Sequence, residues 1–349
     1  SRGLGDVYKR QDILSLSLSE LEEEIVKIGE KKFRAKQIFE WLHVKKVRSF
    51  DQMSNLSVQF RKLLSKEFCI NQLFIARRLE SYIDNTVKYL YRLSDGCYIE
   101  TVLMEYKHGT SLCVSTQVGC KMGCKFCAST IAGFERNLLP SEILGQVYET
   151  ERDSGRKISG IVLMGIGEPL DNYDNVLKFL ELVSAREGNN LSLRHVTLST
   201  CGIVPRIKEL AELKLGLTLS VSLHCAENKG RSEIMPINNA YNIEELMSAT
   251  GEYVKKTGRR ITYEYAVIDG VNSDKKSAEK LTALLRGINC HVNLIPVNAV
   301  KERNYKSSRK SAVKFSEYLS DMGINSTVRR TRGSDINAAC GQLRREAAE

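Results

Sequence analysis

The chain has 349 residues, a formal net charge of +10 at pH 7 and ten cysteines. This length suffices for one large domain and a small one, and no run approaches the ~18 apolar residues that a membrane span requires. We therefore expect a cytoplasmic protein whose cysteines serve metal and redox chemistry and not a disulfide framework.

The N-terminal part predicts a small helical module. Residues 1–11 show no periodicity that continues into the chain after them, and we expect them to be a non-native leader. Residues 12–93 predict a mainly helical accessory domain that binds RNA, with its first capped helix starting at Ser19. The apolar face of the next two helices is expected at Phe33, Ile38 or Phe39, Trp41 or Leu42, and then Phe60, Leu63, Leu64 and Phe68.

Basic residues gather at 31–36, 45–48 and 329–332. Each cluster alone is as typical of a solvated face as of a binding surface. Together, beside a cofactor site, they favour a phosphate-rich partner.

The remainder, residues 94–349, predicts the core domain. Runs at 87–93 and 98–104 flank a turn at Ser94-Asp-Gly96 and predict a linking β-hairpin. Strands are then expected at 112–115, 161–164, 195–199, 217–223, 261–268 and 291–296. Helices are expected at 140–152, 176–185, 205–212, 243–257, 275–286 and 309–322. The fold class is α/β: six repeated units predict a partial (β/α)6 barrel, with the active site at the C-terminal edge of its parallel strands.

One cysteine motif carries the chemistry. Cys120-Lys-Met-Gly-Cys124-Lys-Phe-Cys127 supplies three thiols, whereas structural zinc and ferredoxin clusters take four ligands. Three thiolates on a 4Fe-4S cluster leave one iron open to a small molecule. The spacing resembles the signature of radical S-adenosylmethionine (SAM) enzymes. The alternative is a set of buried or zinc-bound cysteines completed by a distant ligand.

Polar residues follow the predicted strands, as a site at this edge of the sheet requires. Gly167 and Glu168 resemble the radical-SAM segment that pairs with the amino group of SAM. The other residues that resemble SAM contacts are Ser199, Ser222, Leu223, His224 and Asn298. A single glycine or serine there is more often an ordinary turn, but several in succession weaken that alternative.

Four longer motifs narrow the resemblance. They are Cys113-Val-Ser-Thr-Gln-Val-Gly-Cys120, Gly133-Phe-Glu-Arg136-Asn137-Leu, Met164-Gly-Ile-Gly-Glu-Pro-Leu-Asp-Asn172-Tyr and Arg332-Gly-Ser-Asp335-Ile-Asn-Ala-Ala-Cys340-Gly-Gln-Leu343. Over about residues 13–343 the chain resembles the dual-specificity adenine-C2 RNA methyltransferases. The resemblance implies methylation of adenosine 2503 in 23S ribosomal RNA, at the peptidyl transferase centre, and of adenosine 37 in transfer RNAs.

The resemblance also implies three catalytic residues. Cys340 takes a methyl group from one SAM, and a second SAM on the cluster supplies the radical that activates this methyl toward adenine C2. Glu100 accepts the C2 proton, and Cys113 resolves the adduct by forming a transient disulfide with Cys340. From the residues alone, both cysteines could be buried apolar side chains, and Glu100 could face solvent.

Other functions remain open from the sequence. A sister family methylates C8 of the same ribosomal adenosine and confers antibiotic resistance. A radical-SAM enzyme acting on a peptide or metabolite would not explain Cys340, and an RNA-binding protein with structural zinc would contain no iron. For the favoured function we expect 23S rRNA and tRNA as partners, an electron donor such as flavodoxin, no membrane, and a monomer.

Overall fold

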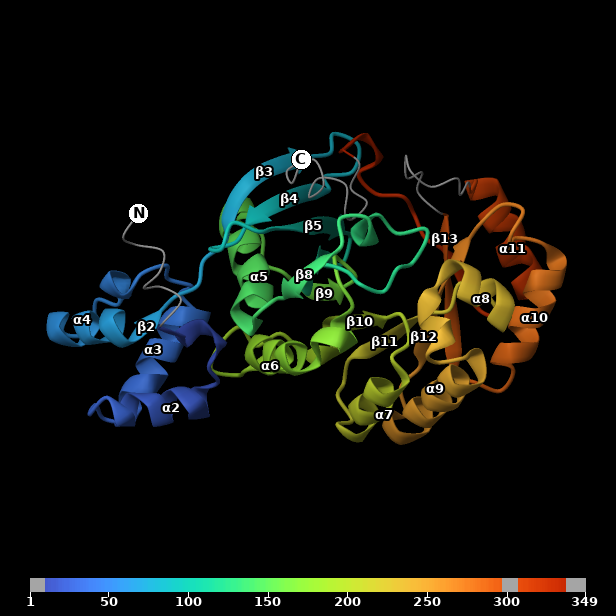
Figure 1. Cartoon of the computed structure of the whole chain (residues 1–349). Helices are drawn as coiled ribbons and strands as arrows, with labels where there is room; N and C mark the ends of the chain where they lie inside the picture. Colours follow the sequence, from blue (N-terminus) through green and yellow to red (C-terminus); the bar gives the residue numbers. More distant parts are fainter. Residues whose placement is uncertain (1–9, 297–306, 337–349) are drawn as a thin grey trace.

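The computed structural model describes residues 10–296 and 307–336 (Figure 1). Its N-terminal part holds three helices, α2 (Leu18–Lys27), α3 (Phe33–His43) and α4 (Val58–Glu67), and a short parallel pair, β1 (Gln11–Asp12) and β2 (Phe68–Cys69). The first helix begins at Leu18, one residue earlier than predicted, because Ser17 and Glu20 form the capping box. Phe33 is 55% exposed and does not belong to the apolar face, since it lies in the first turn of α3, while Ile38, Phe39 and Leu42 are buried.

A ten-stranded sheet organises the rest of the molecule. Its order is β14-β13-β12-β11-β10-β9-β6-β5-β4-β3. The strands are β3 (Phe74–Glu80), β4 (Val87–Arg92), β5 (Tyr98–Tyr106), β6 (Gly109–Cys113), β9 (Gly160–Leu163), β10 (Val196–Thr200), β11 (Thr218–Ser222), β12 (Ile261–Val267), β13 (Cys290–Pro296) and β14 (Ser326–Val328). From β6 to β14 all neighbours are parallel, and β3 to β6 are antiparallel.

This sheet confirms the predicted partial barrel and extends it. The six predicted parallel strands are present, and the linking hairpin β4–β5 continues the same sheet through β5 and β6. Strand β3 and the three-residue strand β14 were not predicted, and they form the two ends of the sheet. A predicted domain boundary between residues 93 and 94 falls in the turn of the β4–β5 pair.

Helices follow the parallel strands as expected, with bounds within three residues of those predicted. They are α5 (Pro140–Ser154), α6 (Tyr173–Ser184), α7 (Val204–Glu212), α9 (Ile243–Thr257), α10 (Lys275–Leu285) and α11 (Arg309–Asp321). The sequence did not predict α8 (Asn228–Ile234), which has only seven residues and therefore too few turns to show a period. A continuous apolar core runs from the N-terminal helices along one face of the sheet, and Val102, Met104 and Cys113 on the other face form a separate small cluster.

Polar contacts join the N-terminal helices to the barrel. The buried His43 ring pairs with the Tyr148 hydroxyl of α5, Nδ1 to oxygen at 2.9 Å, and burial lowers the pKa of His43 to about 3. Lys46 pairs with Glu151 of the same helix. Thus part of the basic cluster at 45–48 binds α5. Along the two described stretches, no helix is long and apolar enough to cross a membrane.

Candidate active site

The three cysteines of the C-x3-C-x2-C motif lie on one loop between the strands of a separate two-stranded ribbon, β7 (Gln117–Gly119) and β8 (Phe134–Asn137). The Cys120 amide donates to the Gly133 carbonyl at 3.2 Å, which closes the base of the loop. The Thr130 hydroxyl donates to the carbonyls of Cys124 and Cys127. The ribbon therefore presents all three thiols from one short, hydrogen-bonded segment.

The surroundings of these thiols fit an iron–sulfur cluster. Cys120 and Cys124 are each 9% exposed, and burial raises the pKa of Cys120 to about 12 and that of Cys124 further. Buried thiols need nearby positive charge to ionise, and bound iron supplies it. Within the described ranges, no three His, Cys, Asp or Glu side chains form a group that could hold a single metal ion. A four-iron cluster is wider than one ion, so its ligands lie farther apart.

Two buried amides bring the sequence motifs together at this ribbon. The Gln117 side chain donates to Asn137 and Asp171 at 2.8 Å and accepts from the Glu168 amide at 2.8 Å. Asn172 donates to the carbonyls of Thr116 and Leu138, also at 2.8 Å. Three motifs that are separate in sequence thus meet beside the cysteine loop.

Gly167 and Glu168 occupy constrained positions. Gly167 has φ +107°, and a Cβ there would lie 2.8 Å from the Gln117 backbone nitrogen, so a side chain would displace β7. Glu168 is buried, and its carboxylate accepts from the amides of Cys201 at 2.7 Å and Leu170 at 3.0 Å. Burial raises its pKa, and these hydrogen bonds oppose the shift. The Glu168 side chain therefore orders the strand ends, while its backbone remains the predicted SAM contact.

His224 lies against the cysteine loop. Its ring meets Phe126 edge-on, with centroids 4.7 Å apart. Nδ1 accepts from the Ala266 amide at 2.9 Å, so the neutral ring carries its proton on Nε2. Burial, assisted by Arg231, lowers the pKa of His224 to about 3, which keeps the ring neutral at physiological pH.

The other predicted SAM contacts lie at neighbouring strand ends, with one exception. Ser199 of β10 lies directly beside Ser220 of β11. Ser222 is two positions after Ser220 on the same strand, and side chains alternate along a strand, so all three serines lie on one face of the sheet. Leu223 is buried and follows directly after β11. Asn298 lies outside the described residues.

Arg231 is a component that the sequence did not reveal. Its side chain is fully buried on α8. It donates to the carbonyls of Cys201 (2.7 Å), Ser222 (3.1 Å) and Leu223 (3.2 Å), and to Asn238 Oδ1 (3.0 Å). Burial lowers its pKa, while the nearby thiols Cys201, Cys124 and Cys225 oppose that shift. A buried cation bonded to neutral oxygens near cluster-type thiols is suited to balance the negative charge of bound thiolates.

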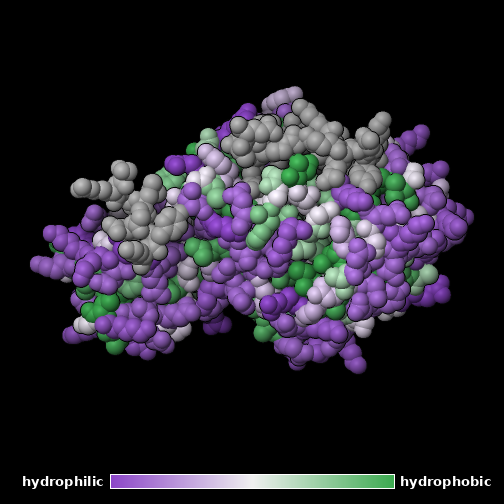
Figure 2. All heavy atoms as spheres, viewed as in Figure 1, coloured by the Kyte–Doolittle hydropathy of each residue, from purple (hydrophilic) through white to green (hydrophobic). Residues whose placement is uncertain are grey.

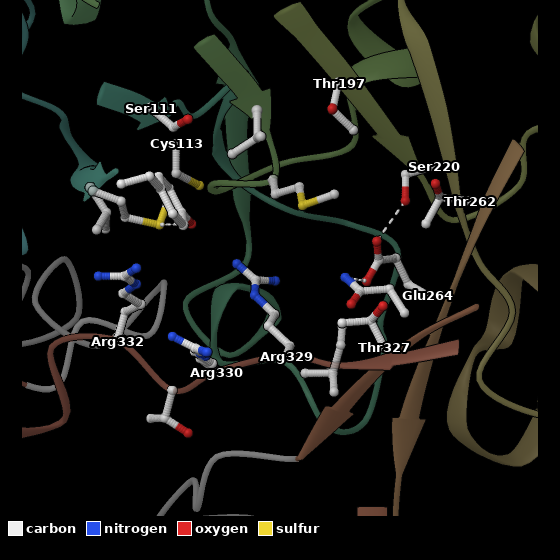
Figure 3. A pocket seen from close by; sticks show the side chains of 18 of the residues that line it. Ser111, Cys113, Thr197, Ser220, Thr262, Glu264, Thr327, Arg329, Arg330 and Arg332 are labelled. Atoms are coloured by element: carbon white, nitrogen blue, oxygen red, sulfur yellow. Dashed lines mark hydrogen bonds between the residues drawn. The ribbon is translucent and has the colours of Figure 1, made fainter. Parts of the chain in front are cut away.

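A cavity of about 890 Å³ opens inside the barrel (Figure 3). Cys113 and Ser111 lie on one wall and Glu264 on the opposite wall, where its carboxylate accepts from Ser220 at 2.7 Å and Asn293 at 2.9 Å. Cys113 is 5% exposed and belongs to a small apolar cluster with Val102 and Met104, against which Ile336 packs.

Three arginines reach the cavity from the segment after β14. Arg329, Arg330 and Arg332 point toward it in Figure 3. Arg332 also lies over the Tyr106 ring, 4.5 Å from its centroid. The Arg329 charge acts on the Glu264 carboxylate of the cavity wall, where it opposes the rise in the pKa of Glu264 caused by burial.

Glu100 lies on β5 and is buried, so it does not face solvent. Its carboxylate pairs with Lys88 of β4, with nitrogen and oxygen 3.0 Å apart and both side chains fully buried. Glu100, Val102 and Met104 alternate onto one face of β5, the face that carries Cys113's apolar cluster. The structure thus brings Glu100 to the same wall as Cys113.

Cys340 also lies outside the described residues, which end at Ile336. It lies four positions after Ile336, a reach of at most about 14 Å. Since Ile336 packs against the cluster that contains Cys113, this reach is compatible with a bond between the two cysteines.

Comparison with known proteins identifies the family of the chain. Residues 11–70 match the family model described as ribosomal RNA large subunit methyltransferase N-terminal domain, and residues 114–282 match the radical SAM superfamily. A probable dual-specificity RNA methyltransferase RlmN of Lachnoclostridium phytofermentans is 52% identical over 343 residues, covering 97% of this chain and 96% of that protein. The corresponding protein of Lachnospira eligens is 50% identical, covering 97% of each.

A solved structure has the same fold over nearly the whole chain. A radical SAM methyltransferase from Sphaerobacter thermophilus is 41% identical, with a TM-score of 0.91 and coverage of 95% of this chain and 98% of that one.

Proposed function

Because the chain belongs to the RlmN family of dual-specificity RNA methyltransferases, which are radical SAM enzymes with a 4Fe-4S cluster, we propose that it methylates C2 of adenosine 2503 in 23S rRNA and of adenosine 37 in tRNAs. Cys120, Cys124 and Cys127 would hold the cluster. Gly167, Glu168, Ser199, Ser222, Leu223, His224 and Asn298 would bind SAM.

The order of steps follows from the reactivity of adenine C2. This carbon has no nucleophilic lone pair, so it cannot displace a methyl group from a sulfonium directly. Cys340 instead attacks one SAM as a thiolate, forming a sulfur–carbon bond while the donor's bond breaks. The cluster held by Cys120, Cys124 and Cys127, together with a second SAM, would supply the radical chemistry that takes one hydrogen atom from the methyl group on Cys340.

The methylene carbon on Cys340 then joins C2, and release needs three events. One electron would pass to the cluster, Glu100 takes the C2 proton, and Cys113 attacks the Cys340 sulfur so that the sulfur–carbon bond breaks and a disulfide forms. The new carbon gains a proton and becomes a methyl group. Lys88 holds the Glu100 carboxylate at the wall where Cys113 lies.

One observation carries this proposal: Ile336, four residues before Cys340, packs against the apolar cluster that contains Cys113. Such packing supports a resolving thiol on the cavity wall and a methyl-carrying thiol nearby. The arginines at 329–332 would bind phosphates of the RNA, whose target base must leave its stack to enter the cavity. We also propose a cytoplasmic monomer that receives electrons from a donor such as flavodoxin.

Cysteine variants test the proposal. Cys113→Ala should purify with RNA covalently attached to the peptide that contains Cys340, as seen by mass spectrometry after nuclease digestion. Cys69→Ala, a change at a half-buried cysteine of the N-terminal part, should carry no RNA. Cys340→Ala should lose methylation but keep its iron. Normal turnover of Cys113→Ala without attached RNA would overturn the role of Cys113, and loss of iron from Cys340→Ala would make Cys340 a cluster ligand.

A further inference from the structure

Residues 329–336, here called the strap, connect the two ends of the open sheet. The strap leaves β14, where the Arg329 amide donates to the Leu294 carbonyl at 2.8 Å. It ends beside the turn between β3 and β4, at the other end of the ten-stranded sheet (Figure 1, dark red beside the blue-green hairpin). Its arginines line the cavity on the way. The strap therefore borders the lumen on the side where the partial barrel is open.

Hydrogen bonds fasten the far end of the strap to this turn. Asp335 accepts from the Ser81 hydroxyl at 2.7 Å with one carboxylate oxygen and from the Tyr82 amide at 3.1 Å with the other. In the opposite direction, Asp84 of the turn accepts from the Gly333 amide at 3.0 and 3.3 Å. Two carboxylates, one on each segment, thus hold together residues about 250 positions apart in sequence.

The turn that receives the strap is ordered by its own contacts. Ser81 is 2% exposed, and its amide donates to the Thr86 carbonyl at 2.8 Å. Its hydroxyl also accepts from the amides of Ile83 and Asp84. Burial raises the pKa of Asp84, but hydrogen bonds from Thr86 and Gly333 outweigh this effect and lower it. A prearranged acceptor of this kind holds the strap at little further cost in entropy.

The contacts of Asp335 lie close in sequence to Cys340. Asp335 lies five residues before Cys340, and Ile336, the next residue, packs against the apolar cluster of Cys113. If the contacts at Asp335 were lost, the nearest residue before Cys340 that is hydrogen-bonded to the rest of the fold would be Gly333, seven positions away. Effective concentration falls roughly as the −3/2 power of tether length, so the longer tether predicts a decrease of about 1.7-fold.

We propose that Asp335 is a positioning residue, whose hydrogen bonds to the β3–β4 turn hold the catalytic-cysteine segment so that Cys340 meets Cys113. The proposal rests on the Cys113–Cys340 disulfide of the proposed function. Asp335 touches no reacting atom in this scheme, and it acts by setting where the chain enters the cavity.

The test is the equilibrium between the two thiols and glutathione. Anaerobic holoenzyme would be equilibrated in glutathione buffers of graded redox ratio and alkylated, and the linked Cys113–Cys340 peptide would be quantified by mass spectrometry. Asp335→Asn keeps the shape of the side chain but removes its charge, and we expect the effective concentration of the thiol pair to fall about 1.7-fold. Asp321→Asn, at the exposed end of α11, is the matched control and should match the wild type.

The possible outcomes separate this inference from the proposed function. An effective concentration in Asp335→Asn equal to that of the wild type, with an unchanged thermal transition, would overturn the positioning role. Absence of the linked peptide from the wild type would overturn the disulfide itself and, with it, the role of Asp335. If Asp335→Asn does not fold, Ser81→Ala removes the hydroxyl that donates to Asp335 and should lower the effective concentration in the same direction.

Discussion

Replacing Arg231 by methionine tests how the cluster end of the barrel is held together. The guanidinium makes four hydrogen bonds of 2.7 to 3.2 Å from a fully buried position. At about 1.5–3 kcal/mol for each bond to a charged group, their loss removes about 6–12 kcal/mol. Relief from burying the charge returns several kcal/mol. We expect a net decrease of about 3–5 kcal/mol in the free energy of unfolding.

The assay is denaturant unfolding of Arg231→Met against Arg186→Met, a change at an exposed arginine that should alter stability by less than about 0.5 kcal/mol. A second readout is the reduction potential of the cluster in folded protein. A positive charge near the thiols favours the reduced, more negative cluster, so its removal should lower the potential by tens of millivolts, at about 59 mV for a tenfold effect on a one-electron couple. An unfolding midpoint equal to that of the wild type would refute this account of Arg231.

The remaining predictions concern the cavity. Lys88→Met removes the ammonium group that lies 3.0 Å from the Glu100 carboxylate. We expect kcat to fall about tenfold or more while the iron content stays unchanged. An unchanged kcat would show that this ion pair has no part in proton removal. Burial raises the pKa of Glu264, despite hydrogen bonds to its carboxylate, so the native state binds the proton more tightly and stability falls as pH rises above about 4.5. Glu264→Gln should reduce the dependence of the free energy of unfolding on pH, measured by denaturation at about pH 5 to 8. An unchanged dependence would contradict the raised pKa of Glu264. Arg329→Gln with Arg330→Gln should reduce the slope of log RNA affinity against log salt by about two in filter binding, whereas two arginines that contact no phosphate would leave it unchanged.

Much of the fold could be predicted because the barrel repeats one pattern. Short apolar strands alternate with helices whose apolar positions recur every three or four residues, and each unit buries its own face. The strap could not be foreseen, because its contacts depend on residues about 250 positions apart. Phe33 illustrates the limit of periodicity: in the first turn of α3 an apolar residue fits the pattern but stays 55% exposed.

The candidate site also has parts that the sequence predicts and parts that it does not. The cysteine loop and the polar strand ends are local in sequence, so spacing alone indicates them. Arg231 and Lys88 are charged residues that sequence reasoning assigns to the surface, and only tertiary structure buries them. The burial of Lys88 had one signal in the sequence. The predicted hairpin of β4 and β5 brings Lys88 close to Glu100, a possible partner of opposite charge on the neighbouring strand. Figure 2 shows a face covered mainly by hydrophilic residues, which is where such charges are usually found.

The most direct test of the central claim is the position and isotope content of the methyl group. Reconstituted protein would be incubated anaerobically with a reductant, SAM carrying a fully deuterated methyl group and protein-free 23S rRNA, and the digested nucleosides would be analysed by mass spectrometry against 2-methyladenosine and 8-methyladenosine standards. We predict 2-methyladenosine that retains one deuterium fewer than the donor methyl carried. A product at C8, or a methyl group transferred with all its deuterium, would contradict the proposed function.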